Sequence, residues 1–501
     1  MKSSALLPSL LLVALLAGAV FLSRPVALAR VAAAAPTAVI PPEVGAAAAL
    51  LPVSATSDAR LAGSFRHPAE NGWIYVHLQG SPATLGFQHG YWLAPEIGKM
   101  LRIFHVSIPH ATNKPWQFFR DAAQNMLLPH IEPEYRQELE GIVAGVRARG
   151  VNADLDDIIV LNAFEEMPDY YVPWYNRHHP SAQTASLHAP GNCSAFIATG
   201  SYTKDGKIVI GHNNWTNYLN GENWNIIFDL VPSHGQHLIM DGFPGVITSD
   251  DDFGINQSGL MITETTISQF NGWDPNGIPE FVRSRKALQY ATSIDDYIAI
   301  MLKGDNGGYA NDWLIGDRKT NEVARLELGL KHHRVWRTKD GMLVGSNFAS
   351  DPALIRDEAP DFRPNDLTTS PNARHARWEQ LKRQYKGKID IALGEKMEAD
   401  HYDTVTHSIH PSEHTLCGHA DLAAHGIPQW DWPPYYPGGT VQAKVADATM
   451  AEHMSFMASM GHPCQTNFDA AKFLKQHPEY GWQKPYLEDM PGRPWTKFSA
   501  K

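Results

Sequence analysis

Residues 191–197 read Gly-Asn-Cys-Ser-Ala-Phe-Ile, and they divide the chain into a mainly helical first part and a strand-rich second part. Cys193 opens an apolar, strand-like run directly after a turn. The next such run, Lys207–Gly211, is followed by His212-Asn213-Asn214-Trp215. A cysteine thiolate is a strong nucleophile near neutral pH. A thiol at the start of one strand, beside a polar cluster at the end of the next, therefore predicts an active site.

The chain beyond Cys193 predicts short strands, because its apolar or β-branched runs are bounded by Gly, Asn, Asp or Pro. These runs are Ser194–Gly200, Lys207–Gly211, Trp224–Val231, His237–Met240, Gly259–Thr265, Asp312–Asp317, Glu322–Leu328 and Met342–Val344. Helices are predicted between them at Pro279–Thr292 and Ile294–Lys303, with Ser293 as an N-cap. Strands, then helices, then strands predict a layered α+β domain with helices packed on antiparallel sheets.

Residues 59–192 predict a mainly helical segment after a short extended start at 73–76. Apolar residues at helical spacing support helices at Glu134–Arg149 and Asp154–Ala163. Residues Tyr171–Gly191 have no apolar period, and their composition predicts a linker. A linker that ends at a nucleophile has the form expected of a removable pro-segment, and an ordinary surface loop is the alternative.

Residues 1–29 predict an export signal, with Lys2 before an apolar stretch. Ala27-Leu28-Ala29 is the candidate cleavage site, and the run Ala32–Ala35 is a second option. An uncleaved membrane anchor is the alternative, because the apolar stretch is long for a signal peptide. Residues 30–58 predict a flexible leader. No later segment approaches ~18 consecutive apolar residues, so no transmembrane span is predicted after the signal. We expect an exported protein, in a secreted, periplasmic or lysosome-like location.

Composition and charge indicate which classes of partner the protein can bind. The 501 residues are 43% hydrophobic and 19% charged, which is typical of a globular protein. The net charge of −11 becomes −13 without residues 1–29, which carry Lys2 and Arg24, and no basic stripe occurs. We therefore expect no nucleic-acid partner. No GxGxxG, Walker A or HExxH pattern occurs, and His332-His333 belongs to no metal-binding pattern, so neither a cofactor nor a metal is predicted.

The chain has three cysteines, Cys193, Cys417 and Cys464. In an oxidising compartment Cys417 and Cys464 could form a disulfide and leave Cys193 free for catalysis. The alternative is that all three are reduced and buried as small apolar side chains.

Five motifs in order resemble those of the phospholipase B-like proteins, a branch of the N-terminal nucleophile hydrolases. They are Cys193-Ser194-Ala195 with residues 212–215, Ser-Asp-Asp-Asp-Phe at 249–253, Ser-Gly-Leu at 258–260 with Thr-Glu-Thr-Thr at 263–266, Asn-Gly-Gly-Tyr-Ala-Asn-Asp-Trp at 306–313, and Gly-Thr-Val-Gln-Ala-Lys-Val at 439–445. The resemblance covers roughly residues 60–498. It departs from the family at 212–215, where His-Asn-Asn-Trp replaces His-Asn-Thr-Trp, and Ser-Asn-Phe stands at 346–348. The penicillin acyltransferase-like branch of the same superfamily is a second resemblance.

The resemblance implies a four-layer αββα catalytic domain at residues 193–501, made as an inactive precursor. The thiol of Cys193 would attack the carbonyl of Asn192, and hydrolysis would leave Cys193 with a free α-amine. The amine has a reference pKa of ~7.7 and the thiol ~8.5, so the amine can accept the thiol proton. The thiolate would then attack an acyl carbonyl, and water would release a fatty acid from the thioester.

Site residues follow from this mechanism. Cys193 would be the nucleophile and His212 would orient or polarise the site, while Asn214 and Trp215 would line the pocket. Asn311 and Asn347 are the expected oxyanion donors, because an amide N–H stabilises negative charge without titrating. The alternatives are structural: Cys193 as a buried cysteine, His212 as a hydrogen-bonded core histidine, and Trp215 as a packing residue. Asn311 and Asn347 would then be turn asparagines. Asp251 and Asp252 are expected to cap a turn, and Glu264 could bind the α-amine.

Three functions are compatible with these residues. The first is an exported acyl hydrolase that acts on lipid esters or amides, for example on phospholipids. The second is an acyltransferase or amidase that acts on N-acylated small molecules or peptides. The third is a non-catalytic exported binding protein of the same fold, in which Cys193 is dispensable and the chain stays intact.

Overall fold

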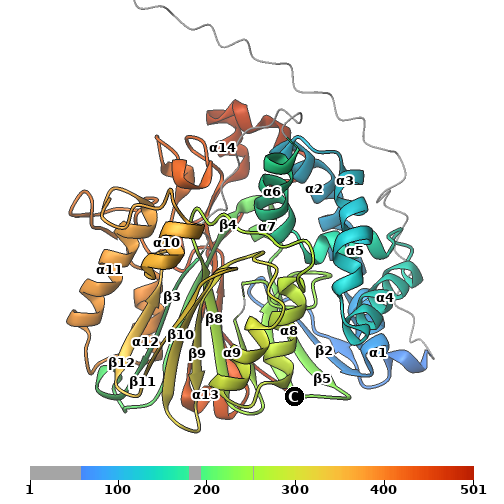
Figure 1. Ribbon diagram of the computed structural model, residues 1–501, viewed down its shortest axis with the longest axis horizontal. Coiled ribbons are helices and arrows are strands. Elements are labelled where there is room, and N and C mark those ends of the chain that lie inside the picture. Colours follow the sequence, from blue (N-terminus) through green and yellow to red (C-terminus); the bar gives the residue numbers. More distant parts are fainter. Residues whose placement is uncertain (1–57, 180–192, 252) are drawn as a thin grey trace, which may run out of the picture. The chain divides into compact units, whose positions relative to one another are not determined.

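The computed structural model describes residues 58–179, 193–251 and 253–501 (Figure 1). The predicted signal peptide, the predicted leader up to residue 57, and both Asn192 and Asp252 lie outside the described residues. Within the described ranges, no helix has the length and apolar character needed to cross a bilayer.

Two large β-sheets form the centre of the fold. The first has nine strands: β1 (Phe65–Arg66), β2 (Ile74–Gly80), β5 (Ile226–Pro232), β6 (Leu238–Gly242), β7 (Gly254–Asn256), β8 (Leu260–Thr266), β9 (Asn311–Asp317), β10 (Glu322–Leu328) and β11 (His333–Thr338), paired in that order. The second has six: β12 (Gly341–Gly345), β3 (Ser194–Thr199), β4 (Val209–Asn217), β15 (Gly438–Asp447), β16 (Ser455–Met460) and β17 (Thr496–Ser499), again in pairing order. Neighbouring strands are antiparallel except β2 and β5, which are parallel.

The two sheets pack face to face. Ile197 of β3 and Ile210 of β4 share one buried apolar cluster with Ile239, Leu314 and Phe456, so it contains side chains from both sheets. Successive side chains of a strand point to opposite faces. Phe196 of β3 accordingly lies in another cluster, together with residues of α11 (Ser370–Gln384) and α12 (Ile391–Glu398). Every residue of β3 is buried because both of its faces are covered.

The remaining large helices cover the outer face of the nine-stranded sheet. They are α1 (Pro82–Trp92), α2 (Ala94–Thr112), α4 (Pro133–Ala148), α5 (Leu155–Asn162), α8 (Glu280–Tyr290) and α9 (Ile294–Leu302). Shorter helices are α3 (Trp116–Ala122), α6 (Val172–His178), α7 (Tyr218–Gly221), α10 (Pro352–Glu358), α13 (Ala448–Glu452) and α14 (Ala470–Gln476). A two-stranded sheet pairs β13 (Tyr402–Asp403) with β14 (Ser408–Ile409). The α+β sandwich with helices on its outer faces confirms the predicted fold class.

Most element predictions agree with the structure to within a few residues, and two do not. Helix α6 occupies residues 172–178, where composition predicted a linker, because Tyr171 and Tyr175 pack against Phe118 with ring centroids 5.4 and 4.9 Å away. These contacts come from tertiary packing and leave no apolar period. Strand β4 runs on to Asn217, so the polar cluster at 212–215 lies within the strand and not after it.

Candidate active site

Cys193 lies immediately before β3 and is fully buried between the two sheets. Ser194 pairs with Asn213 across the β3–β4 ladder, which brings Cys193 opposite Asn214. Its thiol donates a hydrogen bond to Asn214 Oδ1 over 3.8 Å. The backbone of Cys193 has φ 80°, a left-handed conformation that costs free energy in a residue other than glycine and often marks a functional position.

The polar cluster of β4 divides between the two faces of its sheet. His212 and Asn214 share the face of Ile210, which looks into the sandwich. Asn213 and Trp215 take the other face, where Asn213 Nδ2 and Trp215 Nε1 both donate to the carbonyl of Leu416, at 2.9 and 3.2 Å. The structure therefore brings His212 and Asn214 beside Cys193, and Trp215 forms a wall behind them.

Three buried side chains meet at the thiol. Cys193 Sγ, a ring nitrogen of His212 and a carboxylate oxygen of Glu264 all lie within 4.8 Å of one another. The hydroxyl of Tyr309 also donates a hydrogen bond to Glu264 Oε1 at 3.0 Å. Thiolate, imidazole and carboxylate are also ligands of divalent transition metals, so this trio has donors that could hold such an ion.

Burial sets the charge of this trio in the intact chain. It raises the pKa of the Cys193 thiol well above its ordinary value, and the carboxylates of Glu264 and Asp251 raise it further. Burial also lowers the pKa of His212 well below its ordinary value, and the Lys444 ammonium adds to this effect. At neutral pH the thiol is protonated and the imidazole is neutral, so the thiol needs a further base before it can act as a nucleophile.

A buried charge network lies behind His212. The Lys444 ammonium bridges Asp241, at 3.0 Å, and Asp251, and His212 Nδ1 is 3.9 Å from Asp251. Burial and the neighbouring Asp251 raise the pKa of Asp241 to about 8, so one ammonium balances one ionised carboxylate near pH 7. The prediction that Asp251 caps a turn is wrong, because its carboxylate is fully buried in this network and accepts a hydrogen bond from Ser249.

Arg374 of α11 also belongs to the site, although no motif pointed to it. Its guanidinium donates to the carbonyl of Cys193 at 2.6 Å and to Asn347 Oδ1 at 2.6 Å, and it lies 4.5 Å above the Trp215 ring. No carboxylate of the described residues forms an ion pair with it. Burial lowers the pKa of Arg374 to about 9, which leaves a buried positive charge beside the nucleophile.

The two predicted oxyanion donors differ in availability. Asn347 Nδ2 donates to the carbonyl of Thr266 at 2.7 Å, so this amide holds Arg374 on one side and β8 on the other. Asn311 stands opposite Thr266 in the β8–β9 ladder and is fully buried. Neither Asn311 Nδ2 nor Asn214 Nδ2 has a hydrogen-bond partner among the described residues. Asn311 and Asn214 are thus the amides with a free N–H.

The predicted disulfide between Cys417 and Cys464 is absent from the structure, in which both cysteines are free thiols. The two sulfurs are nevertheless neighbours, since each lies 3.7 Å from Nε2 of His419. This cluster is connected to the active site through Leu416, the residue before Cys417, whose carbonyl binds Asn213 and Trp215 of β4.

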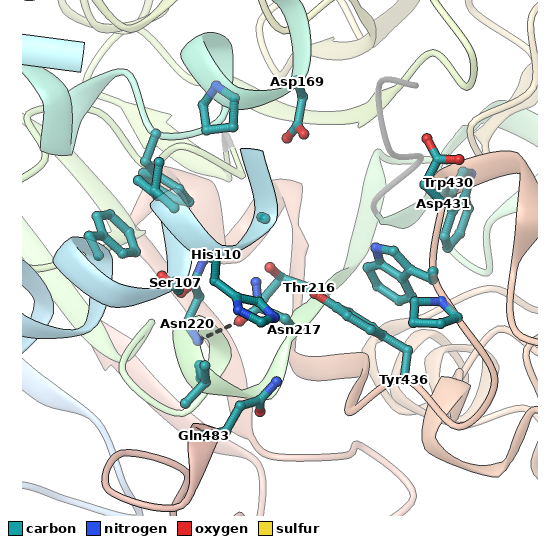
Figure 2. Close-up of a pocket in the computed structure, with 18 of the residues that line it drawn as sticks. Ser107, His110, Asp169, Thr216, Asn217, Asn220, Trp430, Asp431, Tyr436 and Gln483 are labelled. Carbon is teal, nitrogen blue, oxygen red and sulfur yellow. Dashed lines mark hydrogen bonds between the residues drawn. The ribbon is translucent and has the colours of Figure 1, made fainter. Parts of the chain in front are cut away.

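A pocket of about 340 Å³ lies at the C-terminal end of β4, where Thr216 and Asn217 line it (Figure 2). Figure 2 shows Ser107 and His110 of α2 on one side, Trp430 and Tyr436 on the other, and Thr216 of β4 between them. Further apolar side chains line it, namely Phe104, Ile108, Phe164, Leu219, Trp432 and Trp482. The ring of Trp430 also packs edge-on against Trp215, at 5.9 Å between centroids, so the pocket wall adjoins the outer face of β4. Cys193 itself does not line the pocket.

Comparison with known proteins gives a consistent answer. The model of the family described as phospholipase B matches residues 119–337, which include Cys193 and all of β4. An uncharacterized protein of Archaeoglobus fulgidus is 24% identical over 270 residues, which cover 50% of this chain and 42% of that protein.

Two named relatives match shorter stretches. Putative phospholipase B-like 2 of Rattus norvegicus is 34% identical over 149 residues, which cover 26% of this chain and 24% of that protein. Phospholipase B-like protein F of Dictyostelium discoideum is 28% identical over 177 residues, which cover 33% and 31%. In each case the match spans less than half of the relative's own length. The chain is therefore similar to the phospholipase B-like family over a stretch that includes Cys193 and the whole of β4.

Proposed function

We propose that the protein is an acyl hydrolase whose nucleophile is Cys193, freed as an N-terminus by cleavage of its own chain. Similarity to the phospholipase B-like proteins supports a hydrolase-like function. The observation that carries the finer proposal is the buried trio at the strand start, in which Cys193, His212 and Glu264 have their reactive atoms within 4.8 Å of one another.

The first step is cleavage between Asn192 and Cys193. The Cys193 sulfur attacks the carbonyl carbon of Asn192, the C–N bond breaks, and the thiol proton ends on the departing nitrogen. Water then hydrolyses the thioester, which yields the Asn192 carboxylate and restores the thiol. The left-handed backbone of Cys193 supports this step, because strain at the scissile position is relieved when the chain is cut.

The second step is acyl transfer. The new α-amine accepts the thiol proton, the thiolate attacks the acyl carbonyl, and the leaving alcohol or amine takes the proton. Water then cleaves the thioester and releases the carboxylic acid. Glu264 is suited to bind the α-ammonium, and Asn214 and Asn311 have uncommitted amide N–H groups for the oxyanion.

The pocket supports a substrate with an apolar acyl chain. Its volume of about 340 Å³ lies in the range of ligand pockets, ~300–1,000 Å³, and aromatic rings supply most of its apolar lining. Two of its three carboxyls carry little charge, because burial raises the pKa of Glu165 to about 8 and raises that of Asp169 well above its ordinary value. The third carboxyl, Asp431, is exposed to solvent. The aromatic lining supports a lipid acyl group as the ligand.

We also propose that the protein acts outside the cytoplasm. The support is the apolar stretch of residues 1–29 with its Ala-x-Ala site. N-terminal sequencing of protein recovered from separated cell fractions tests this, since an exported protein lacks residues 1–29.

The decisive test of the nucleophile is the intact mass of the purified protein beside Cys193→Ala, followed by activity on a lipid panel. We expect a fragment that begins at Cys193 in wild type and none in the variant. Lysophospholipids and N-acyl amino compounds serve as parallel substrates. Release of fatty acid from lysophospholipids supports the lipid hydrolase, and turnover of the N-acyl compounds alone supports an amidase.

A wild-type chain that stays intact and still hydrolyses lipids would contradict the α-amine mechanism. An intact chain with no turnover of either substrate class would favour a binding protein.

A further inference from the structure

We propose that His401, Cys417, His419 and Cys464 form a zinc site, separate from the active site, that holds three loops of the six-stranded side of the sandwich together. One donor atom from each residue lies within 4.8 Å of the other three. The residues are far apart in sequence except for the Cys417-Gly418-His419 tripeptide. Their spacing matches no known zinc-binding sequence pattern, and the fold brings the four residues together.

The donor geometry suits tetrahedral zinc. Zn–S and Zn–N bonds of ≈ 2.3 and ≈ 2.0 Å place a sulfur and a nitrogen ligand about 3.5 Å apart. His419 Nε2 lies 3.7 Å from Cys417 Sγ and 3.7 Å from Cys464 Sγ, so two edges of the tetrahedron are already present. Side-chain shifts of about 1 Å would complete the remaining edges.

Outside the cluster, Cys464 Sγ lies 3.1 Å from Thr466 Oγ1. The Nε2 atom of His401 is buried and has no hydrogen-bond partner among the described residues. Cys417 and His419 are buried, while His401 and Cys464 are half-buried, which gives an ion a path from solvent. A disulfide between the two sulfurs would use neither imidazole. Zn²⁺ instead uses all four side chains, and two thiolates neutralise its charge.

Each ligand is held by its own segment. His401 directly precedes β13, and its carbonyl accepts the N–H of His410 at 3.0 Å. Gly418 donates its N–H to Thr440 Oγ1 at 2.9 Å, which fastens the Cys417–His419 tripeptide to β15. Cys464 follows β16, where the chain turns at Gly461 with φ 80°. Zinc at this point cross-links three loops.

The site also touches the wall of the active site. Leu416, the residue before Cys417, binds the side chains of Asn213 and Trp215 through its carbonyl. A Cβ on Gly418 would lie 1.8 Å from the Trp215 ring, so the tripeptide rests directly on that ring. A bound ion would therefore stabilise the position of Trp215 without contacting substrate.

The test is the metal and thiol content of the full chain, expressed without a polyhistidine tag and purified without reductant or chelator. We expect one zinc per chain by mass spectrometry of the elements, and three free thiols after denaturation with chelator. Removal of zinc should lower Tm by several degrees, and added Zn²⁺ should restore it. One free thiol and no zinc would overturn the proposal in favour of the disulfide.

Substitutions of single residues test which side chains bind the zinc ion. Cys464→Ser and His401→Gln should each weaken zinc binding by at least about 100-fold, since even outer-shell changes cost ~10–100-fold. His425→Ala, an exposed histidine of the same region, should keep one zinc, as should Cys193→Ala. Loss of zinc in Cys193→Ala with retention in Cys464→Ser would overturn the proposal, because it assigns the ion to the Cys193 trio.

A spectroscopic measurement on wild type covers the case in which a ligand variant fails to fold. Replacement of zinc by Co²⁺ should produce the strong visible bands of a tetrahedral ion and a near-ultraviolet thiolate-to-metal band. A weak, octahedral spectrum without the thiolate band would contradict a two-cysteine, two-histidine site.

Discussion

The two sulfur clusters of this protein differ in what holds them. Cys193 precedes a central strand, and its neighbours His212 and Glu264 project from β4 and β8, whose backbones are fixed by sheet hydrogen bonds. Cys417 and Cys464 stand on loops outside the strands, and His419 lies between them, with Nε2 3.7 Å from each sulfur. In the strand-held cluster, sheet hydrogen bonds keep Cys193 buried in its strained backbone conformation. The loop-held cluster gains its cohesion from an ion, and this contrast leads to four tests.

The largest expected effect is that of Cys193→Ala on hydrolysis. Loss of the nucleophile should lower kcat/KM by at least about 10³-fold, because residual catalysis then comes only from binding and oxyanion donors. The free energy of unfolding should change by only about 1 kcal/mol. Steady-state kinetics and urea unfolding measure the two quantities. An unchanged kcat/KM in the variant would show that Cys193 is not the nucleophile.

The next largest effect is expected from Arg374→Lys. Lysine keeps the positive charge, but it lacks the two guanidinium N–H groups that donate to Cys193 O and Asn347 Oδ1. One of these two buried acceptors therefore loses its donor. We expect a loss of about 2 kcal/mol in unfolding free energy and about 10²-fold in kcat. The matched control is Arg377→Lys, one turn along α11, where a half-buried ion pair with Asp400 survives the exchange.

An Arg374→Lys variant that matches the Arg377→Lys control in both kcat and stability would show that the fork is not needed. The strand-held cluster would then depend on β3, β4 and β8 alone.

Gly418→Ala tests how closely the two clusters are coupled. The new Cβ would lie 1.8 Å from the Trp215 ring, so the tripeptide or the ring must move. We expect a loss of about 1–3 kcal/mol in unfolding free energy, the usual cost of overpacking. Gly481→Ala is the control, because no atom lies within 4 Å of its new Cβ. Equal unfolding curves for the two variants would show that the loop yields freely at Gly418.

The last test concerns pH. Burial raises the pKa of Glu165 to about 8, above its unfolded value of 4.5. The protonated form is therefore favoured in the fold, so its contribution to stability is complete below pH 4.5 and is lost as pH rises through about 8. Glu165→Gln should flatten part of the decline in unfolding free energy between pH 5 and pH 8.5. A decline as steep in the variant as in wild type would assign it to other buried carboxyls, such as Asp241.

Much of the fold was predictable because strands and helices carry local signals. The Ser293 N-cap and the apolar spacing of α4 and α5 placed three helices to within two residues. The aromatic helix α6 was missed, since its stability comes from rings on α3 and not from its own period. The end of β4 was missed for a related reason, because backbone pairing with β15 continues through polar side chains that a hydrophobic pattern does not include.

The candidate site was predictable in part. Cys193, His212 and Asn214 stood in one motif across two adjacent strands, and the ladder brought them together. Arg374 lies 181 residues beyond Cys193 and belongs to no motif, so its contact with the Cys193 carbonyl was invisible in the sequence. Asn347 was predicted as an oxyanion donor, and in the structure its side chain contacts Arg374 and the carbonyl of Thr266.

The sequence by itself determined the strand pattern and the polar motif beside Cys193, because each depends on residues that are close along the chain. Only the tertiary structure decided which charges face the thiol and which residues meet Cys417 and Cys464. The physical reason is that burial and long-range contact set the pKa of a side chain and the partners of a donor atom. Neither quantity exists until the sheets and loops have packed.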